Sequence, residues 1–246
     1  MGSGSVLITS LENNKIKELV KLQNKKYRDE KNLFLIETLN IINEAYELGI
    51  LKEIYKTEDL DIDLNIPTYD VTLNVMNKIK QIKTSKIVGV AYKMDNTKIK
   101  GNKILLLDGI QDPGNLGTII RSALGFNIDT IILSNNCVDL YNDKVIRATE
   151  GALFKINIIR KDLKEAINTL NKNNIPIYKT DVNNGIDVCK IKKDKYAVII
   201  GSEGKGISKE IKDIIKQSIY IKTNKELESL NVGVATSIIL YELDKK

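Results

Sequence analysis

The sequence of 246 residues contains no histidine, two cysteines and three prolines. The absence of histidine excludes catalytic triads built on histidine and histidine general bases. Cys137 and Cys189 lie far apart in the chain, so a structural zinc site is not expected. Any acid–base chemistry therefore has to use aspartate, glutamate, lysine, tyrosine, cysteine or arginine.

Long apolar runs and low-complexity tracts are also missing. No apolar run approaches the ~20 residues that cross a bilayer, and the N-terminus lacks the apolar stretch of a signal peptide. We therefore expect a cytoplasmic protein without membrane contact. Residues 1–5, Met-Gly-Ser-Gly-Ser, are typical of an expression-tag remnant and are left out of the fold reasoning.

The composition is compatible with one large or two modest hydrophobic cores, since 42% of the residues are hydrophobic. The formal net charge is +6, which fits a polyanionic partner without demanding one. The high content of lysine, asparagine and isoleucine is also what an AT-rich genome produces, and this weakens the charge argument.

The N-terminal half predicts a small α/β domain, because apolar runs alternate with helical patterns. Residues 93–102 are polar and aperiodic, which predicts a linker. We expect a first domain at 6–95, a linker at 96–102 and a second domain at 103–246. The expected N-terminal elements are helices at 12–23, 39–48 and 71–79 and strands at 32–36, 51–55, 66–69 and 87–92.

Basic residues form a strip that begins near the end of the first expected helix. Lys21, Lys25 and Arg28 are spaced by four and three residues, so they share one face if that helix continues. The strip is either a solvated lysine-rich face or a surface that contacts RNA phosphates.

The C-terminal half predicts a mostly parallel sheet covered by helices. Asn115 is a plausible N-cap for the helix that follows it. The expected strands are 104–107, 130–133, 156–159, 175–179 and 196–200, and the expected helices are 116–126, 144–154, 163–170, 209–215 and 230–243.

A glycine-rich loop follows the strand expected at 196–200. Its sequence is Gly201-Ser-Glu-Gly-Lys-Gly206, and a helical pattern begins after Ser208. Glycines let a ligand approach the backbone, and a helix N-terminus presents free N–H groups. The spacing matches neither the phosphate loop nor the dinucleotide fingerprint. A tight turn that binds no ligand is the alternative.

Two further segments favour a ligand-binding loop over a turn that binds no ligand. One begins at Leu107 and contains Asn115, Gly117 and Arg121, and the other contains Ser229-Leu-Asn-Val232. With Gly201-Ser-Glu-Gly204, these residues resemble the three motifs of the SpoU/TrmH family in the SPOUT superfamily, in the same order. The resemblance covers nearly the whole chain.

This resemblance implies an RNA ribose 2′-O-methyltransferase that uses S-adenosyl-L-methionine and works as a homodimer without metal. It implies an α/β fold with a small N-terminal RNA-binding domain, and a C-terminal SPOUT domain whose mostly parallel sheet ends in a trefoil knot, a rare exception to unknotted topology. Lys25-Lys-Tyr-Arg28 and Phe34-Leu-Ile-Glu37 resemble the substrate-binding domain found ahead of such catalytic domains. The sequence departs from that pattern at Thr38, where the family usually has glycine.

The resemblance also implies which residues form the site. Arg121 is expected at the target ribose, near the methyl donor of the partner subunit. The pKa of an arginine guanidinium exceeds about 12, so orienting the hydroxyl and binding phosphate is a more reasonable role for it than general base. The expected catalytic residues are Arg121, Asn115, Glu203, Ser229 and Asn231; the expected donor-binding residues are Thr180, Gly201, Ile221 and Leu230; and the expected RNA contacts are Lys25, Arg28 and Arg147.

Several alternatives stay open at this point. Arg147 contacts RNA phosphate or pairs with Glu150 three residues later, and Glu203 is a catalytic group or a carboxylate that caps a helix. Ribosomal RNA is the favoured substrate because of the extra N-terminal domain, with transfer RNA as the alternative. A non-catalytic RNA-binding protein that keeps the knot is a third possibility, against which the intact motifs argue.

Overall fold

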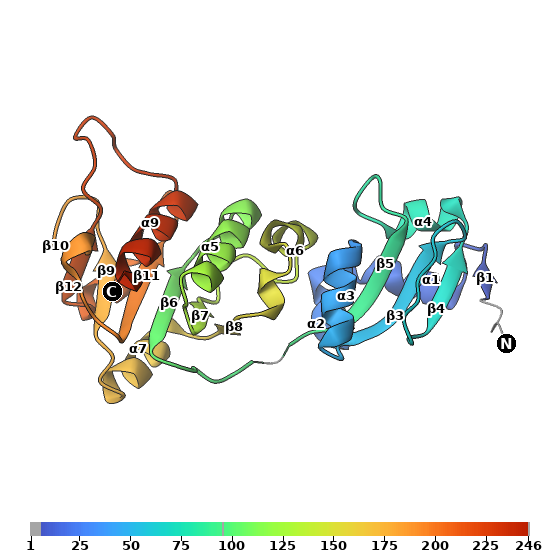
Figure 1. The fold of residues 1–246 in the computed structure, drawn as a ribbon, viewed down its shortest axis with the longest axis horizontal. Coiled ribbons are helices and arrows are strands. Elements are labelled where there is room, and N and C mark those ends of the chain that lie inside the picture. The colour runs from blue at the N-terminus through green and yellow to red at the C-terminus, as the bar shows by residue number, and fades with distance from the viewer. Residues whose placement is uncertain (1–5, 95, 246) are drawn as a thin grey trace. The chain divides into compact units, whose positions relative to one another are not determined.

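The computed structural model describes residues 6–94 and 96–245, which form two compact units (Figure 1). The first unit consists of residues 6–94 together with 139–146, and the second of 96–138 and 147–245. The tag-like residues 1–5 and the expected domain ends at 95 and 246 lie outside the described residues. No helix in the described part of the chain combines the length and apolar character needed to cross a membrane.

The first unit is built on a five-stranded mixed sheet of order β1-β4-β3-β5-β2. Strands β1, β4 and β3 pair in parallel, whereas β5 is antiparallel to both β3 and β2. The strands are β1 (Leu7–Ile8), β2 (Leu33–Ile36), β3 (Leu51–Thr57), β4 (Thr68–Val71) and β5 (Ile87–Tyr92), and the helices are α1 (Asn14–Lys21), α2 (Lys25–Lys31), α3 (Leu39–Glu47) and α4 (Leu73–Ile79).

The first N-terminal helix does not continue through the basic strip. Helix α1 ends at Lys21, and α2 begins at Lys25 after the Asn24 side chain accepts a hydrogen bond from the Lys26 N–H. An asparagine that caps a new helix competes with continuation of the old one. The basic residues before and after this break therefore do not share one helical face.

The second unit contains a seven-stranded sheet of order β10-β12-β9-β11-β6-β7-β8, in which every neighbouring pair is parallel. Its central strands are nearly continuous apolar runs, as expected for a sheet covered on both faces. The strands are β6 (Lys103–Asp108), β7 (Thr130–Leu133), β8 (Asn157–Arg160), β9 (Ile177–Thr180), β10 (Ile186–Asp187), β11 (Tyr196–Gly201) and β12 (Gln217–Tyr220).

Helices pack around this sheet, and α5 lies beside α9 (Figure 1). Gly233 of α9 allows this approach, because an added Cβ would lie 3.2 Å from the Thr118 side chain. The helices are α5 (Pro113–Gly125), α6 (Asp143–Thr149), α7 (Leu163–Lys172), α8 (Lys209–Ile214) and α9 (Val232–Asp244), with 3₁₀ turns η1 (Ala152–Phe154) and η2 (Val188–Lys190).

The N-cap predicted for α5 is also corrected. Asp112, and not Asn115, is the N-cap, and its carboxylate accepts the Asn115 N–H at 2.7 Å. Pro113 occupies the first helical position, where a missing N–H costs nothing. The Asn115 side chain is therefore available for other contacts.

The strand order places a crevice at one edge of the sheet. The chain leaves β6 toward β7 and β8, and then returns to the other side of β6 for β9 and β11. In open parallel sheets, ligands bind outside the carboxyl ends of strands where the winding direction reverses. The reversal lies between β6 and β11, and the carboxyl ends of β9 and β12 follow beside that of β11 at the same edge of the sheet.

Candidate active site

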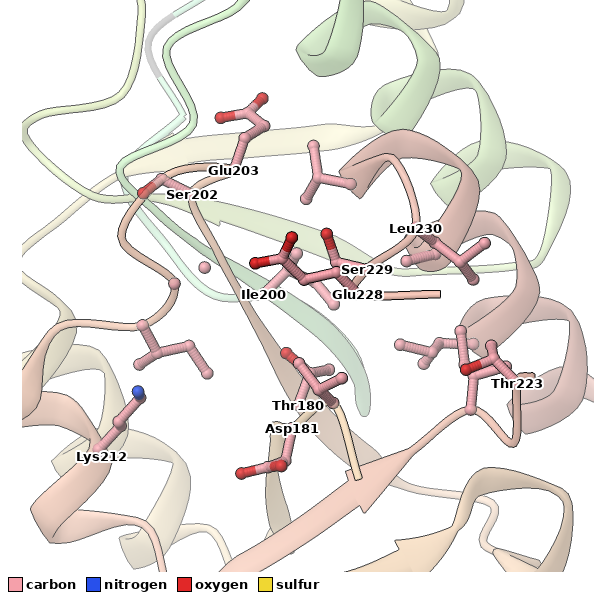
Figure 2. Close-up of a pocket in the computed structure, with 18 residues that line it drawn as sticks. Thr180, Asp181, Ile200, Ser202, Glu203, Lys212, Thr223, Glu228, Ser229 and Leu230 are labelled. Atoms are coloured by element: carbon pink, nitrogen blue, oxygen red, sulfur yellow. The ribbon is translucent and has the colours of Figure 1, made fainter. Parts of the chain in front are cut away.

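A cavity of about 400 Å³ lies beyond the carboxyl ends of β9, β11 and β12 (Figure 2). Its lining comes from Thr180 at the end of β9, from Gly201 at the end of β11 and from the segments on either side of Ser229. Parallel pairing in register brings these strand ends to one edge, although they are far apart in the sequence. The volume falls in the range of about 300–1,000 Å³ that is usual for small-molecule sites.

The glycine loop closes on itself beside this cavity. Ser202 and Gly206 exchange backbone hydrogen bonds of 3.2 and 2.9 Å. A Cβ added to Gly201 would lie 2.1 Å from the Gly206 carbonyl carbon, so only glycine fits there. Gly206 has a φ of +66°, which also favours glycine. The loop is therefore a tight turn, and it also lines the cavity.

A chain of hydrogen bonds links the three sequence motifs. The side-chain oxygen of Asn231 accepts the Gly233 and Val234 N–H groups as the N-cap of α9. Its amide donates to the Asn115 oxygen at 3.1 Å, and the Asn115 amide donates to the Glu203 carboxylate at 2.6 Å. Side-chain hydrogen bonds thus join residues 115, 203 and 231.

Glu203 is not the carboxylate that meets the start of α8. Asp108 at the end of β6 accepts the Ser208 N–H at 2.8 Å, while the hydrogen bond described for Glu203 comes from Asn115. The helix-capping alternative for Glu203 is therefore wrong for α8. Sequence reasoning missed Asp108, although its position directly after a buried strand was a usable signal.

Arg121 lies on α5 and is not among the residues that line the cavity of its own chain. Its side chain is 54% exposed, and its guanidinium lies 3.6 Å from the Glu150 carboxylate. One turn earlier, Gly117 allows close packing, because an added Cβ would lie 2.2 Å from the Ala148 Cβ. Glu150 was weighed as a partner of Arg147, whereas the structure brings it to Arg121.

All four residues expected to bind the donor, Thr180, Gly201, Ile221 and Leu230, line the cavity. Of the expected catalytic residues, Glu203 and Ser229 line it as well, whereas Asn115 and Asn231 adjoin it through the hydrogen-bond chain. The Thr180 hydroxyl donates to the Ile199 carbonyl at 3.0 Å.

The lining fits S-adenosylmethionine. Apolar side chains offer faces for the planar adenine, and polar strand ends offer hydrogen-bonding groups for its edge and for the ribose. Three acidic side chains suit a ligand that carries a sulfonium cation. The apolar group includes Ile200, Ile207, Ile221, Leu230, Val232 and Ile239, and the acidic group is Asp181, Glu203 and Glu228.

Asp181 directly follows Thr180, and it lines the cavity as the position of these two residues at a strand end suggested. Burial acts to raise the pKa of Asp181, but the N–H groups of Asn183 and Asn184 outweigh it, and the net shift is downward. Both N–H groups donate to its carboxylate at 3.1 Å. This carboxylate is therefore held ionised at the mouth of the cavity. Lys212 and Glu228 also line the cavity, and the sequence motifs assigned no role to either of them.

The expected RNA contacts in the first unit lie in very different environments. Lys25 is exposed and pairs with Asp29 at 2.5 Å. The Arg28 side chain is only 8% exposed, and its guanidinium bonds to Asp139 at 2.8 Å and to the Leu22 and Gln23 carbonyls. The prediction that Arg28 contacts RNA is corrected, because the guanidinium is buried and both of its terminal nitrogens already bond within the fold.

Arg147, the third expected RNA contact, is an exposed residue of α6. In the described ranges 6–94 and 96–245, no group of three or more histidine, cysteine, aspartate or glutamate side chains is arranged to hold a metal ion.

Comparison with known proteins accounts for both halves of the chain. Residues 102–241 match the SpoU rRNA Methylase family, and residues 13–88 match the MRM3-like substrate binding domain. The chain is 32% identical over 243 residues to the 23S rRNA (guanosine(2553)-2′-O)-methyltransferase RlmP of Bacillus subtilis, covering 96% of this chain and 98% of that protein.

Solved structures agree with this match. The AdoMet-bound rRNA methyltransferase from Sinorhizobium meliloti superposes with a TM-score of 0.84 at 28% identity, covering 96% of each chain. A structure described as an RNA 2′-O ribose methyltransferase gives a TM-score of 0.81 at 25% identity, covering 96% of this chain and 97% of the other. The two family matches, the full-length relative and the shared fold establish that this chain belongs to the SpoU rRNA methylase family.

Proposed function

We propose that this protein transfers a methyl group from S-adenosylmethionine to a ribose 2′-hydroxyl in RNA, and that its substrate is ribosomal RNA. The observation that carries the proposal is the hydrogen-bond chain from Asn231 through Asn115 to Glu203, which joins the three motifs beside a cavity suited to the donor. The full-length relative from Bacillus subtilis, whose name describes this reaction on 23S rRNA, supports the choice of substrate.

When bound, S-adenosylmethionine supplies a methyl group activated by its sulfonium. The role of the protein is then to align the ribose oxygen with that methyl group and to exclude water. Thr180 and the backbone at Gly201 would hold the donor, and Ile221 and Leu230 would pack against its adenine. These roles agree with the position of all four residues on the cavity wall.

Arg121 is proposed to bind the phosphate beside the target ribose and to orient the hydroxyl. A guanidinium is a poor general base but a good bidentate ligand for phosphate. Ser229 and the Asn231–Asn115–Glu203 chain would position the ribose and Arg121. The ion pair with Glu150 is exposed on both sides, so RNA can displace it at little cost.

A homodimer is part of this proposal. Arg121 does not line the cavity of its own chain, which supports a role beside the donor held by a partner subunit. Val234 and Tyr241 of α9 are each about half exposed, and an apolar face of this kind suits a subunit interface. We also propose that the C-terminal segments form a trefoil knot, that the first domain ends at residue 95 and that the second begins at residue 103. The proposed location is the cytoplasm.

The first unit is proposed to bind RNA. The match of residues 13–88 to a substrate-binding domain supports this role. Lys25 of this unit and Arg147 of the second unit remain proposed phosphate contacts, and both are exposed. Arg28 is excluded from this set by its burial.

The test is calorimetric titration with S-adenosylmethionine, followed by transfer of labelled methyl groups to separated large ribosomal RNA, small ribosomal RNA and transfer RNA. We expect donor binding and label in large ribosomal RNA. Label found only in transfer RNA would show that the substrate is transfer RNA and not ribosomal RNA. Donor binding without transfer to any of these RNAs would require a test with a ribosome-assembly intermediate. A protein that fails to bind the donor would be a non-catalytic member of the family.

A further inference from the structure

The charged side chains on the cavity wall are unequal in number. Lys212 is the one basic residue among the eighteen described residues that line the cavity, whereas three are acidic. Figure 2 shows Lys212 on the opposite side of the cavity from Leu230 and Thr223. The proposed adenine-packing residue and the single cation thus mark two ends of the cavity.

The two ends of S-adenosylmethionine differ in the same way as the two ends of the cavity. Its adenine is planar and mainly apolar, while its methionyl end carries an ammonium group and a carboxylate. Near Asp181, Glu203 and Glu228 that carboxylate would be repelled, because like charges at short range are unfavourable. It therefore needs a cation on the cavity wall.

We propose that Lys212 binds the carboxylate of the methionyl end and selects S-adenosylmethionine over adenosyl compounds that lack this group. The inference rests on the proposed function, because it assumes that the cavity holds this donor. Lys212 is a specificity-determining residue in this proposal, and it takes no part in the methyl transfer itself.

Several contacts fix the segment that carries Lys212. Ile207 and Ile211 are buried in the core of the second unit on either side of the start of α8. The Ser208 N–H donates to the Asp108 carboxylate at 2.8 Å, and the Lys212 carbonyl accepts a hydrogen bond from the Lys179 ammonium at 2.8 Å. The backbone of Lys212 is thus anchored at the edge of the cavity.

The Lys212 ammonium is available for a ligand. The residue is exposed, and among the described residues no carboxylate lies within 4.0 Å of its nitrogen. By contrast, Lys164 and Lys161 of the same unit are paired with glutamates. Lys209 is also exposed on α8 but is not among the cavity-lining residues, so it provides a matched control.

The experiment compares two ligands by calorimetry, S-adenosylmethionine and its decarboxylated analogue, which keeps the adenine, the sulfonium and the amine. We expect Lys212→Gln to weaken S-adenosylmethionine binding about fivefold, the upper end for an exposed charge pair. The same substitution should leave binding of the analogue unchanged or tighten it, because the analogue carries only positive charges that Lys212 repels. Lys209→Gln should not weaken the binding of either ligand.

Weaker binding of S-adenosylmethionine without weaker binding of the analogue is a signature that a general loss of folding cannot produce. Thermal unfolding of each variant checks the fold separately. Equal weakening of both ligands by Lys212→Gln, or no weakening of either, would overturn the inference while leaving the proposed function in place. If the wild-type protein binds neither ligand, the proposed function fails and the inference fails with it.

Discussion

The two units differ in the surroundings of their most informative charged side chains. In the first unit, buried or half-buried charges are paired within the fold, as in Arg28 with Asp139 and Lys56 with Asp70. In the second unit, charged groups gather around a cavity, and Lys212 lies there without a carboxylate partner among the described residues. The second unit also has an internal pair, Lys103 with Asp244, but it keeps other charged groups for its cavity.

The difference follows from sheet topology. The mixed sheet of the first unit has antiparallel neighbours, so its strand ends are divided between both edges. In the second unit every strand is parallel, and all carboxyl ends meet at one edge. Polar residues that follow buried strands converge there without any local sequence signal.

The largest expected effect concerns Arg121, a charged residue of the second unit that we place at the reaction. Arg121→Ala should lower methyl transfer by about a thousandfold, as expected for removal of a group that positions the reacting atoms. Donor affinity should stay within a few-fold, because Arg121 does not line the cavity of its own chain. Single-turnover transfer and calorimetry measure the two quantities.

Arg121→Lys is the control that keeps the charge but loses the planar fork. Retained turnover in Arg121→Ala would remove this residue from the reaction. Loss of donor binding together with turnover would make it a structural residue like Arg28.

Arg28→Ala should destabilise the protein by about 3–5 kcal/mol, because it leaves the half-buried Asp139 carboxylate without its partner. Lys25→Ala removes an exposed pair three residues earlier and should cost at most about 1 kcal/mol. Denaturant unfolding measures both. If Arg28→Ala left stability unchanged but weakened RNA binding, Arg28 would be a ligand-binding residue and not a stabilising one.

Gly201→Ala tests the closed glycine loop of the second unit. The new Cβ would meet backbone atoms of Gly206 and Ile207 at 2.1 and 2.2 Å, so the loop has to move. We expect a loss of about 1–3 kcal/mol in stability and a loss of donor affinity. Gly204→Ala is the matched control, since its Cβ would have no neighbour within 4 Å. Equal donor affinity in both variants would contradict a donor-binding role for this loop.

The smallest effect is expected on the surface of the first unit. Lys25→Glu should weaken RNA binding a few-fold at low salt, and the difference should shrink as salt rises, because phosphate contacts release counterions. The exposed Lys172 of α7 provides a charge-reversal control in the second unit. If both reversals acted equally, net charge and not a specific surface would explain the binding.

Much of the second unit could be predicted from the sequence. Buried parallel strands are apolar runs, so β6, β7 and β11 were located to within a residue or two at each end. Strand β12 was missed because Gln217–Tyr220 is polar and buries only Ile219. Its strand geometry comes from pairing with β9 and β10, which no local pattern reveals.

Some site residues could likewise be found from the sequence, whereas others could not. Thr180, Gly201, Ile221 and Leu230 were selected through family motifs, and they line the cavity, although their roles in binding remain predictions. Lys212 was not selected, since nothing in its local sequence distinguishes it from Lys209. Only the packing of α8 brings one of the two lysines to the cavity.

The sequence by itself determined the family, the reaction class it implies and the alternation of strands and helices, because motifs and apolar periodicity are local properties. Tertiary structure alone decided that Arg28 is buried against Asp139, that Asp112 caps α5 and that Asn115 therefore contacts Glu203. Burial and side-chain pairing depend on residues distant in the chain, and these become neighbours only when the sheets form.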